Sequence, residues 1–142
     1  MITLDPACPW YRFSICKSAT LEAKGVSVSL GMQFDNVTTD AVQYHAEDRD
    51  ITALVVFETS GDDVALCHER LCCEEVYLAE VHGDIMDLVG APILKASHET
   101  GETGVGVYHF YHLATAKGYV TFRFIAESNQ YSHDVDVYTI HN

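Results

Sequence analysis

The sequence predicts a single α+β domain over residues 1–142 that is rich in β-structure, an antiparallel sheet or meander with one or two short helices. A chain of 142 residues, 48% of them apolar, suits one packed domain and is short for two. Apolar side chains recur at every second position in many short stretches, as in half-buried strands, whereas one stretch carries helix signals. We expect N-terminal strands or an arm at 1–50 and a β-rich core at 51–140.

The first half of the chain predicts four strands and one irregular stretch. The aromatic run at 10–16 and the alternation of apolar and small polar residues at 26–34 are typical of strands. The polar, acidic stretch 35–50 is expected to be irregular. The β-branched run 51–58 ends at a Ser-Gly-Asp-Asp turn, so 64–68 is expected to return beside it as a hairpin.

A strand and then a short helix are predicted in the middle of the chain. The Val and Tyr content of 74–81 favours a strand, with Val76, Leu78 and Glu80 on one face. The helix signals follow at 84–89, which begins at an Asp that can cap it and is followed by a Gly-Ala-Pro stop.

The last third of the chain predicts strands at 93–97, 107–114, 119–127 and 133–140. The Gly-rich stretch 101–106 is expected to be a mobile loop. A short connection containing Lys-Gly joins the second and third of these strands, which indicates a hairpin.

The charge of the chain excludes several classes of function. There are 21 acidic and 8 basic side chains, a formal net charge of −13, whereas nucleic-acid polymers and anionic membranes require a surplus of Lys and Arg. No apolar run is long enough to span a bilayer, and the N-terminus MITLDPACPWYRF lacks the pattern of a secretory signal. We therefore expect a cytoplasmic protein with no nucleic-acid polymer and no membrane as partner, and with reduced cysteines.

Side chains of metal-binding type gather in the segment CHERLCCEE, at Cys67, His68, Cys72, Cys73 and Glu74. The spacing lacks the second Cys/His pair of a zinc site, and Cys72 stands where a metalloprotease helix needs a second His. His109 and His112 fall on opposite faces of one strand, so they do not extend the cluster. We favour core packing of Cys67 and Cys72 over a metal site or a thiol enzyme, and expect no metal, no cofactor and no catalytic residue.

Arg123 is the most informative single residue, because it interrupts the strand pattern VTFRFIAE in a chain with few bases. An ion pair with one of the many acids explains Arg123 alone, and core packing explains each neighbouring aromatic alone. In combination, an Arg on a rigid strand can grip a phosphate through its forked guanidinium while aromatic rings stack on a base. The residues assigned to ligand binding are Arg123, Lys117, Tyr108, Phe110, Asn129 and Tyr131.

Two segments resemble a bacteriophage protein family of unknown-function domains, over about 51–140. The family's His-Glu-x-x-Cys-Cys-Glu-x-Val-Tyr lies here at His68 to Tyr77, and its Gly-Asp-x-x-Asp-Leu-x-Gly-x-Pro-Ile-Leu-x-Ala lies at Gly83 to Ala96. The second segment is ATAKGYVTFRFIAESNQYS. This chain departs from the family in a shortened Ser-Asn-Gln-Tyr-Ser turn, in Phe124 where Trp is frequent, and in a Gly-rich 99–106. If that turn lines the pocket, its choice of ligand is expected to differ.

The resemblance implies a function. The family is associated with the Thoeris anti-defence proteins, phage sponges that sequester cyclic ADP-ribose-type signals of host TIR-domain enzymes without cleaving them. Relatives are associated with cyclic oligonucleotide signals of another defence system, CBASS. The resemblance further implies β-rich homo-oligomers, a dimer or a trimer of dimers, with ligand pockets between subunits, in the cytoplasm of the bacterial host.

A different class of function remains open from the residues alone. An acidic surface of net charge −13 can mimic nucleic acid and block a basic host protein through a salt-sensitive complex. A small cyclic phosphate needs only a few cations, so the same charge is compatible with a sponge.

Overall fold

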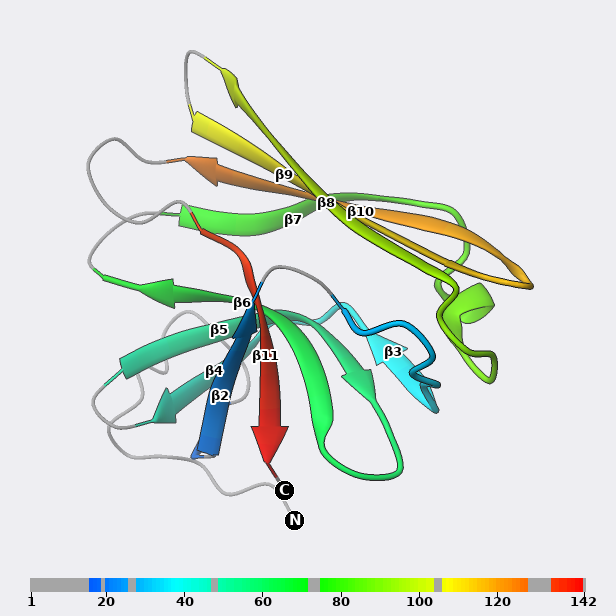
Figure 1. Cartoon of the computed structure of the whole chain (residues 1–142). Helices are drawn as coiled ribbons and strands as arrows, with labels where there is room; N and C mark the ends of the chain where they lie inside the picture. Colours follow the sequence, from blue (N-terminus) through cyan, green and yellow to red (C-terminus); the bar gives the residue numbers. More distant parts are fainter. Residues whose placement is uncertain are drawn as a thin grey trace.

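Two stacked β-sheets form the described part of the molecule (Figure 1). The computed structural model describes the backbone of residues 16–18, 20–25, 28–46, 49–71, 75–103, 106–127 and 134–141. Among these residues no helix is long and apolar enough to cross a membrane.

The larger sheet is rolled up on itself, and we call it the rolled sheet. Its strands are β1 (Cys16–Ser18), β2 (Thr20–Gly25), β3 (Asn36–Thr38), β4 (Val42–Ala46), β5 (Arg49–Glu58), β6 (Asp63–Arg70) and β11 (Asp136–His141). Their order is β1-β4-β5-β6-β11-β2, with β3 also paired to β5. β1 and β2 stand at opposite ends of this order, yet one residue separates them in the chain. Since two residues span at most about 7 Å, the two ends of the sheet are held together.

The smaller sheet has four strands and lies across the rolled sheet (Figure 1). Its strands are β7 (Glu75–His82), β8 (Lys95–Thr103), β9 (Gly106–Thr115) and β10 (Gly118–Glu127), in the antiparallel order β7-β10-β9-β8. The 3₁₀-helix η1 (Ile85–Leu88) joins β7 to the segment before β8. The hairpin of β9 and β10 forms where the sequence predicts one.

The main hydrophobic core fills the space between the sheets. Phe34 stacks on Phe57 at 4.7 Å between ring centroids, and Phe57 meets the edge of Phe122 at 5.9 Å. These three rings are 0% exposed, and burying each stabilises the fold by about 1.5–3 kcal/mol. A second cluster, which includes Tyr44, Ile51 and Cys67, lies on the other face of the rolled sheet.

Polar side chains also lie on the inner face of the four-stranded sheet. His98 Nε2 is 3.0 Å from His109 Nδ1, and the His98 ring stacks on Tyr111 at 4.2 Å between centroids. The buried Tyr111 hydroxyl donates to the carbonyl oxygen of Val135, the residue just before β11 of the rolled sheet. This hydrogen bond ties the two sheets together within the apolar core.

The prediction of an α+β fold is wrong, because the described residues contain no α-helix and the fold is all-β apart from one 3₁₀ turn. Asp84 does cap the predicted helix, since its Oδ1 accepts from the Met86 N–H at 2.9 Å. The turn ends after Leu88, however, which is buried in the core and anchors the segment between two strands. One turn cannot offset the cost of nucleating an α-helix, so the short 3₁₀ geometry prevails.

Three further predictions of local structure are wrong. The stretch 26–34 holds only isolated bridges from Gln33 and Phe34 in its described part, because its partners are the loop residues Pro92 and Val89. The stretch 35–50 contains β3, β4 and the start of β5. The stretch 101–106 is largely strand, since β8 extends to Thr103 and β9 begins at Gly106. β4 can contain polar residues because they form hydrogen bonds with the neighbouring strand β5. For example, Thr52 Oγ1 donates to the buried Gln43 Oε1 at 3.0 Å. The predicted strand 10–16 lies almost wholly outside the described residues.

Candidate ligand-binding face

The four-stranded sheet turns one face away from the core, and we call it the outer face. Strand alternation decides which side chains lie there: Phe122 and Phe124 are 0% exposed, whereas the Arg123 side chain between them is 26% exposed. The strand pairing places the following residues on the outer face: Glu80 and His82 of β7, Tyr119, Thr121 and Arg123 of β10, Tyr108, Phe110 and His112 of β9, and Ser97 and Glu99 of β8.

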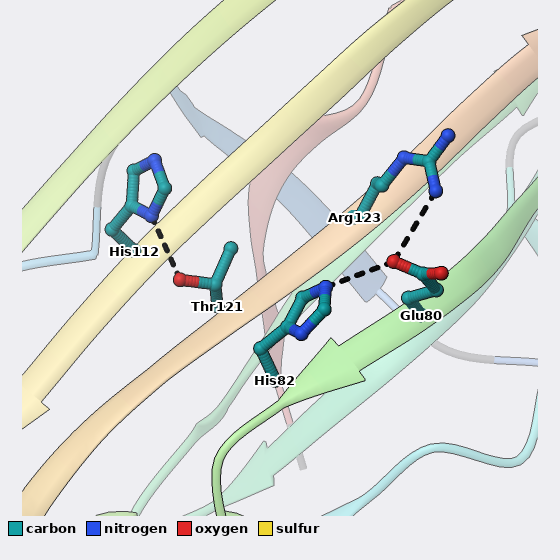
Figure 2. A network of polar contacts seen from close by, with 5 residues as sticks. All are labelled: Glu80, His82, His112, Thr121 and Arg123. Carbon is teal, nitrogen blue, oxygen red and sulfur yellow. Dashed lines mark hydrogen bonds and ion pairs between the residues drawn. The ribbon is translucent and has the colours of Figure 1, made fainter.

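An acidic side chain holds Arg123 in place (Figure 2). Arg123 Nη1 lies 3.2 Å from Glu80 Oε2, and His82 Nε2 lies 2.8 Å from the same oxygen. These contacts, that of His82 first and that of Arg123 second, hold the pKa of the Glu80 carboxyl below its usual value. Burial disfavours the charged form of Arg123, but hydrogen bonds to Glu80 and Tyr108 outweigh it and raise the pKa of the guanidinium. Arginine is always protonated in proteins, and these contacts orient the cation.

A β-bulge creates this pairing. β10 and β7 shift register between Arg123 and Phe124, so that Arg123 faces Glu80 while Phe124 faces Leu78. Ala79 is the extra residue, and it moves Glu80 off the face that Leu78 shares with the core. The expectation that Glu80 shares a face with Val76 and Leu78 is therefore wrong, and for this reason sequence reasoning missed the partner of Arg123.

Aromatic rings continue from Arg123 along the outer face. The Arg123 guanidinium carbon lies 4.6 Å from the centroid of the Tyr108 ring, a cation–π geometry. The next rings follow at centroid distances of 6.4 Å from Tyr108 to Phe110, 6.1 Å from Phe110 to His112 and 5.9 Å from His112 to Tyr119. The planes of Phe110 and His112 differ by 3°. This ladder offers flat apolar surface on which planar rings can stack.

The imidazole of His112 is held from both sides. Its Nδ1 lies 2.9 Å from Thr121 Oγ1 (Figure 2), and its Nε2 lies 3.4 Å from Glu99 Oε2. An ionised carboxylate only accepts hydrogen bonds, so Nε2 carries the proton and, in the neutral ring, Nδ1 accepts from the Thr121 hydroxyl. Neither His112, Thr121 nor Glu99 was among the predicted site residues, because the alternation of the strands identifies a face but not the pairs upon it.

The predicted ligand-binding residues divide into three groups. Arg123, Tyr108 and Phe110 come together on the outer face. Lys117 lies in the turn before β10, six residues from Arg123, or about 20 Å along a strand. Its Nζ donates to the carbonyl oxygens of Met86 at 3.1 Å and Val89 at 2.8 Å, so it secures the 3₁₀ turn. Asn129 and Tyr131 lie outside the described residues.

The Cys/His segment is divided between two faces of β6. Cys67 is buried in the second apolar cluster, where burial and then Asp136 raise the pKa of its thiol. His68 points the other way, with Nδ1 2.8 Å from the Asp134 carbonyl oxygen. Cys72, Cys73 and Glu74 lie outside the described residues. In the part of the chain that is described, no three His, Cys, Asp or Glu side chains are grouped as metal ligands.

A comparison with protein families matches residues 21–137 to the family described as Domain of unknown function (DUF7448). The match includes the whole of β7 to β10 and so the outer face. It also begins well before the segment 51–140, on which the resemblance noted above depends. Comparisons with curated proteins and with solved structures give no match.

Proposed function

The chain belongs to the DUF7448 family, and we propose that it binds a cyclic nucleotide on its outer face and sequesters it without cleaving it. The proposed ligand is a cyclic ADP-ribose isomer or a cyclic oligonucleotide used as an immune signal. Because its motifs resemble those of a phage family, the proposal includes a role as an anti-defence protein. It would act as a homo-oligomer in the cytoplasm of the host.

The observation that carries the proposal is the placement of Arg123. Glu80 fixes the guanidinium through Nη1, and Tyr108 lies against it at 4.6 Å. A guanidinium has five N–H donors in a rigid fork, so donors remain for a phosphate after the contacts with Glu80 and Tyr108. Because the fork is already oriented, little side-chain entropy is lost when an anion binds.

The aromatic ladder supplies the second half of nucleotide recognition. Tyr108, Phe110 and His112 follow one another along β9 beside the guanidinium. A base stacked on such a ring gains about 1–3 kcal/mol, as measured by alanine substitution. A phosphate on Arg123 and a base on these rings thus use neighbouring side chains of one rigid sheet.

The geometry favours binding over cleavage. Thr121, His112 and Glu99 stand in the order of a nucleophile, a base and an orienting acid. Thr121, however, is only 9% exposed and lies in mid-strand, paired with His112 on one side and His82 on the other. The backbone N–H groups of such a strand donate to the neighbouring strands of the sheet. They are therefore not available to stabilise the negative charge that develops in a cleavage reaction.

A thermal-shift panel of cyclic ADP-ribose isomers and cyclic di- and trinucleotides tests the proposal. A ligand at about 100 times its dissociation constant stabilises the folded protein by about 2.7 kcal/mol. We expect such a shift with one ligand, and recovery of that ligand intact by chromatography after heat denaturation. Recovery of a cleaved product would instead show a hydrolase, and Thr121→Val would then identify the nucleophile.

The net charge of −13 favours a second candidate, an acidic inhibitor of a basic host defence protein. This candidate predicts no thermal shift with any nucleotide and a protein complex that dissociates as salt is added, because exposed charges are screened. A shift with a nucleotide in the panel, retained at about 0.5 M salt, would contradict it.

A further inference from the structure

An open hollow of about 460 Å³ lies at the start of β8. Three of its wall residues are large apolar side chains that remain exposed, Leu30 at 65%, Leu94 at 56% and Tyr119 at 55%. Single apolar side chains scattered over a surface are ordinary, but a group of them around one opening is typical of a surface that another molecule covers.

A cation stands beside these apolar walls. Lys95 lines the hollow and is exposed, and in the described part of the chain it has no ion-pair partner. Ser97 lies two residues further along β8, on the same face, and adds a hydroxyl that can donate. The hollow therefore offers an apolar surface together with donors for one negative charge.

The hollow adjoins an open edge of the four-stranded sheet. β8 is last in the sheet order, so no other described strand pairs with its second side. The Ala114 carbonyl oxygen accepts from the Leu94 N–H at 2.8 Å, so the backbone groups of Ala114, and those of Lys95 opposite it, face into the β8–β9 ladder. Alternation along the strand then directs to the open side the N–H and C=O groups of Ala96, His98 and Thr100. An extended chain can add to β8 through these groups.

The segment before β8 determines where such a chain stops. The Gly31 N–H donates to the Ile93 carbonyl oxygen, and the Ile93 N–H donates to that of Met32, both at 2.8 Å. The turn at 30–31 therefore occupies the same edge just before β8, so an added chain ends beside Lys95 rather than running past it. The cation there selects a carboxylate over an amino group, which makes the added chain antiparallel to β8.

The charges further along β8 complement a basic chain. Glu99 and Glu102 are both exposed and follow Lys95 by four and seven residues. Opposite charges that face each other across two antiparallel strands stabilise the pair. With the last residue of the added chain opposite Lys95, the fifth residue from its end faces Glu99, and Lys or Arg fits there.

We propose that β8 and the hollow bind the carboxyl-terminal segment of a partner protein, an extended chain with a large apolar last residue and a basic residue four positions before it. The chain pairs with the open edge of β8, its last side chain enters the hollow, and its carboxylate binds Lys95 and Ser97. This interaction is separate from nucleotide binding, because it uses β8 and not Arg123 of β10.

Fluorescence anisotropy with the amino-terminally labelled peptide Thr-Lys-Thr-Thr-Val-Phe tests the proposal. We expect the wild type to bind this peptide, and to bind its carboxyl-terminal amide about tenfold more weakly, since hydrogen bonds to a charged group are lost. Replacement of the final Phe by Ala should weaken binding by about tenfold or more, because the contact with the apolar walls is lost. Lys95→Gln should abolish the difference between the free acid and the amide.

Thr100→Pro tests the open edge. The Thr100 N–H faces the open side, so proline there removes a donor to the peptide while the β8–β9 ladder keeps its hydrogen bonds. We expect weaker peptide binding and an unchanged circular dichroism spectrum. Met86→Ala and Arg49→Ala are the matched controls, because they remove an exposed apolar side chain and a cation outside the hollow, and both should bind the peptide as the wild type does.

Equal binding of the acid and the amide by the wild type would overturn the assignment, and so would a preference for the acid that persists in Lys95→Gln. Absence of binding of the free acid at about 1 mM, the range of the weakest specific complexes, would overturn it too. None of these results bears on the nucleotide panel, so the docking surface and the proposed function can fail separately.

Discussion

The proposed nucleotide binding depends on Arg123 more than on any other single residue. The property that matters is the planar, forked shape of its guanidinium group. Arg123→Lys keeps the positive charge but loses the planar guanidinium that rests on Tyr108 and contacts Glu80. A hydrogen bond to a charged group contributes about 1.5–3 kcal/mol, so we expect Arg123→Lys to bind a nucleotide about 10- to 100-fold more weakly. Calorimetry measures this change. Equal affinity of Arg123→Lys and the wild type would show that only charge is needed.

A single half-buried histidine, His98, is expected to make the stability of the folded protein depend on pH. Burial, and then the neighbouring His109, lower the pKa of His98 below its usual value of 6.5, while Asp134 opposes them. Between the lowered pKa and 6.5 the unfolded chain binds more protons than the folded chain, so stability falls as the pH falls through this window.

The measurement is the melting temperature between about pH 7.5 and 5.5. We expect a smaller fall in His98→Gln than in the wild type. The carboxyl of Asp136, whose pKa burial raises, acts in the opposite sense at lower pH, and it is present in both proteins. An identical fall in His98→Gln would refute the assignment.

The turn after β7 is an element that depends on glycine. Gly83 has φ +100°, and a Cβ added there would collide with the backbone carbonyl oxygen of Tyr119. Gly90 has φ +78°, but a Cβ there would meet nothing within 4 Å. We expect Gly90→Ala to cost about 1–2 kcal/mol, the cost of left-handed backbone alone, and Gly83→Ala to cost more. Chemical denaturation of the two variants gives the difference, and equal losses would contradict the close approach of Tyr119 to Gly83.

Some strands and turns can be predicted from the sequence, and others cannot. Strong alternation and a clear turn predict the hairpin of β9 and β10 and the partners β5 and β6, because these contacts are local. The bulge at Ala79 has no signal in the pattern, so Glu80 is assigned to the wrong face. The 3₁₀ turn forms at the segment where the sequence carries helix signals at both ends. Its length is limited because Leu88 is buried and because Lys117 Nζ donates to the carbonyl oxygens of Met86 and Val89.

For the molecule as a whole, the pattern predicts β-structure and a shared core but not the arrangement of the sheets. β11 enters the rolled sheet between β6 and β2, and β1 pairs with β4 in parallel. Such pairings join residues far apart in the chain, and alternation within a strand carries no information on its neighbours. The candidate site was predicted in part for the same reason: Arg123, Tyr108 and Phe110 share one hairpin, whereas Glu80 reaches them through a distant strand.

The net charge of −13 also acts on the whole molecule. We expect this charge to repel nucleic-acid polymers over about a Debye length, while Arg123 on the outer face remains available to a small ligand at contact. The proposed sponge would then owe its specificity to charge placement as well as to contacts.

Calorimetry of the wild type, Arg123→Ala and Arg49→Ala, with the ligand that the panel identifies, tests whether Arg123 binds a nucleotide that is later released uncleaved. Arg49→Ala is the matched control, because it removes a partly exposed Arg that pairs with Glu69 on the rolled sheet. We expect binding by the wild type and Arg49→Ala, at least about tenfold weaker binding by Arg123→Ala, and unchanged ligand in the recovered solution. Equal binding by all three proteins, or a cleaved ligand, would refute the role proposed for Arg123.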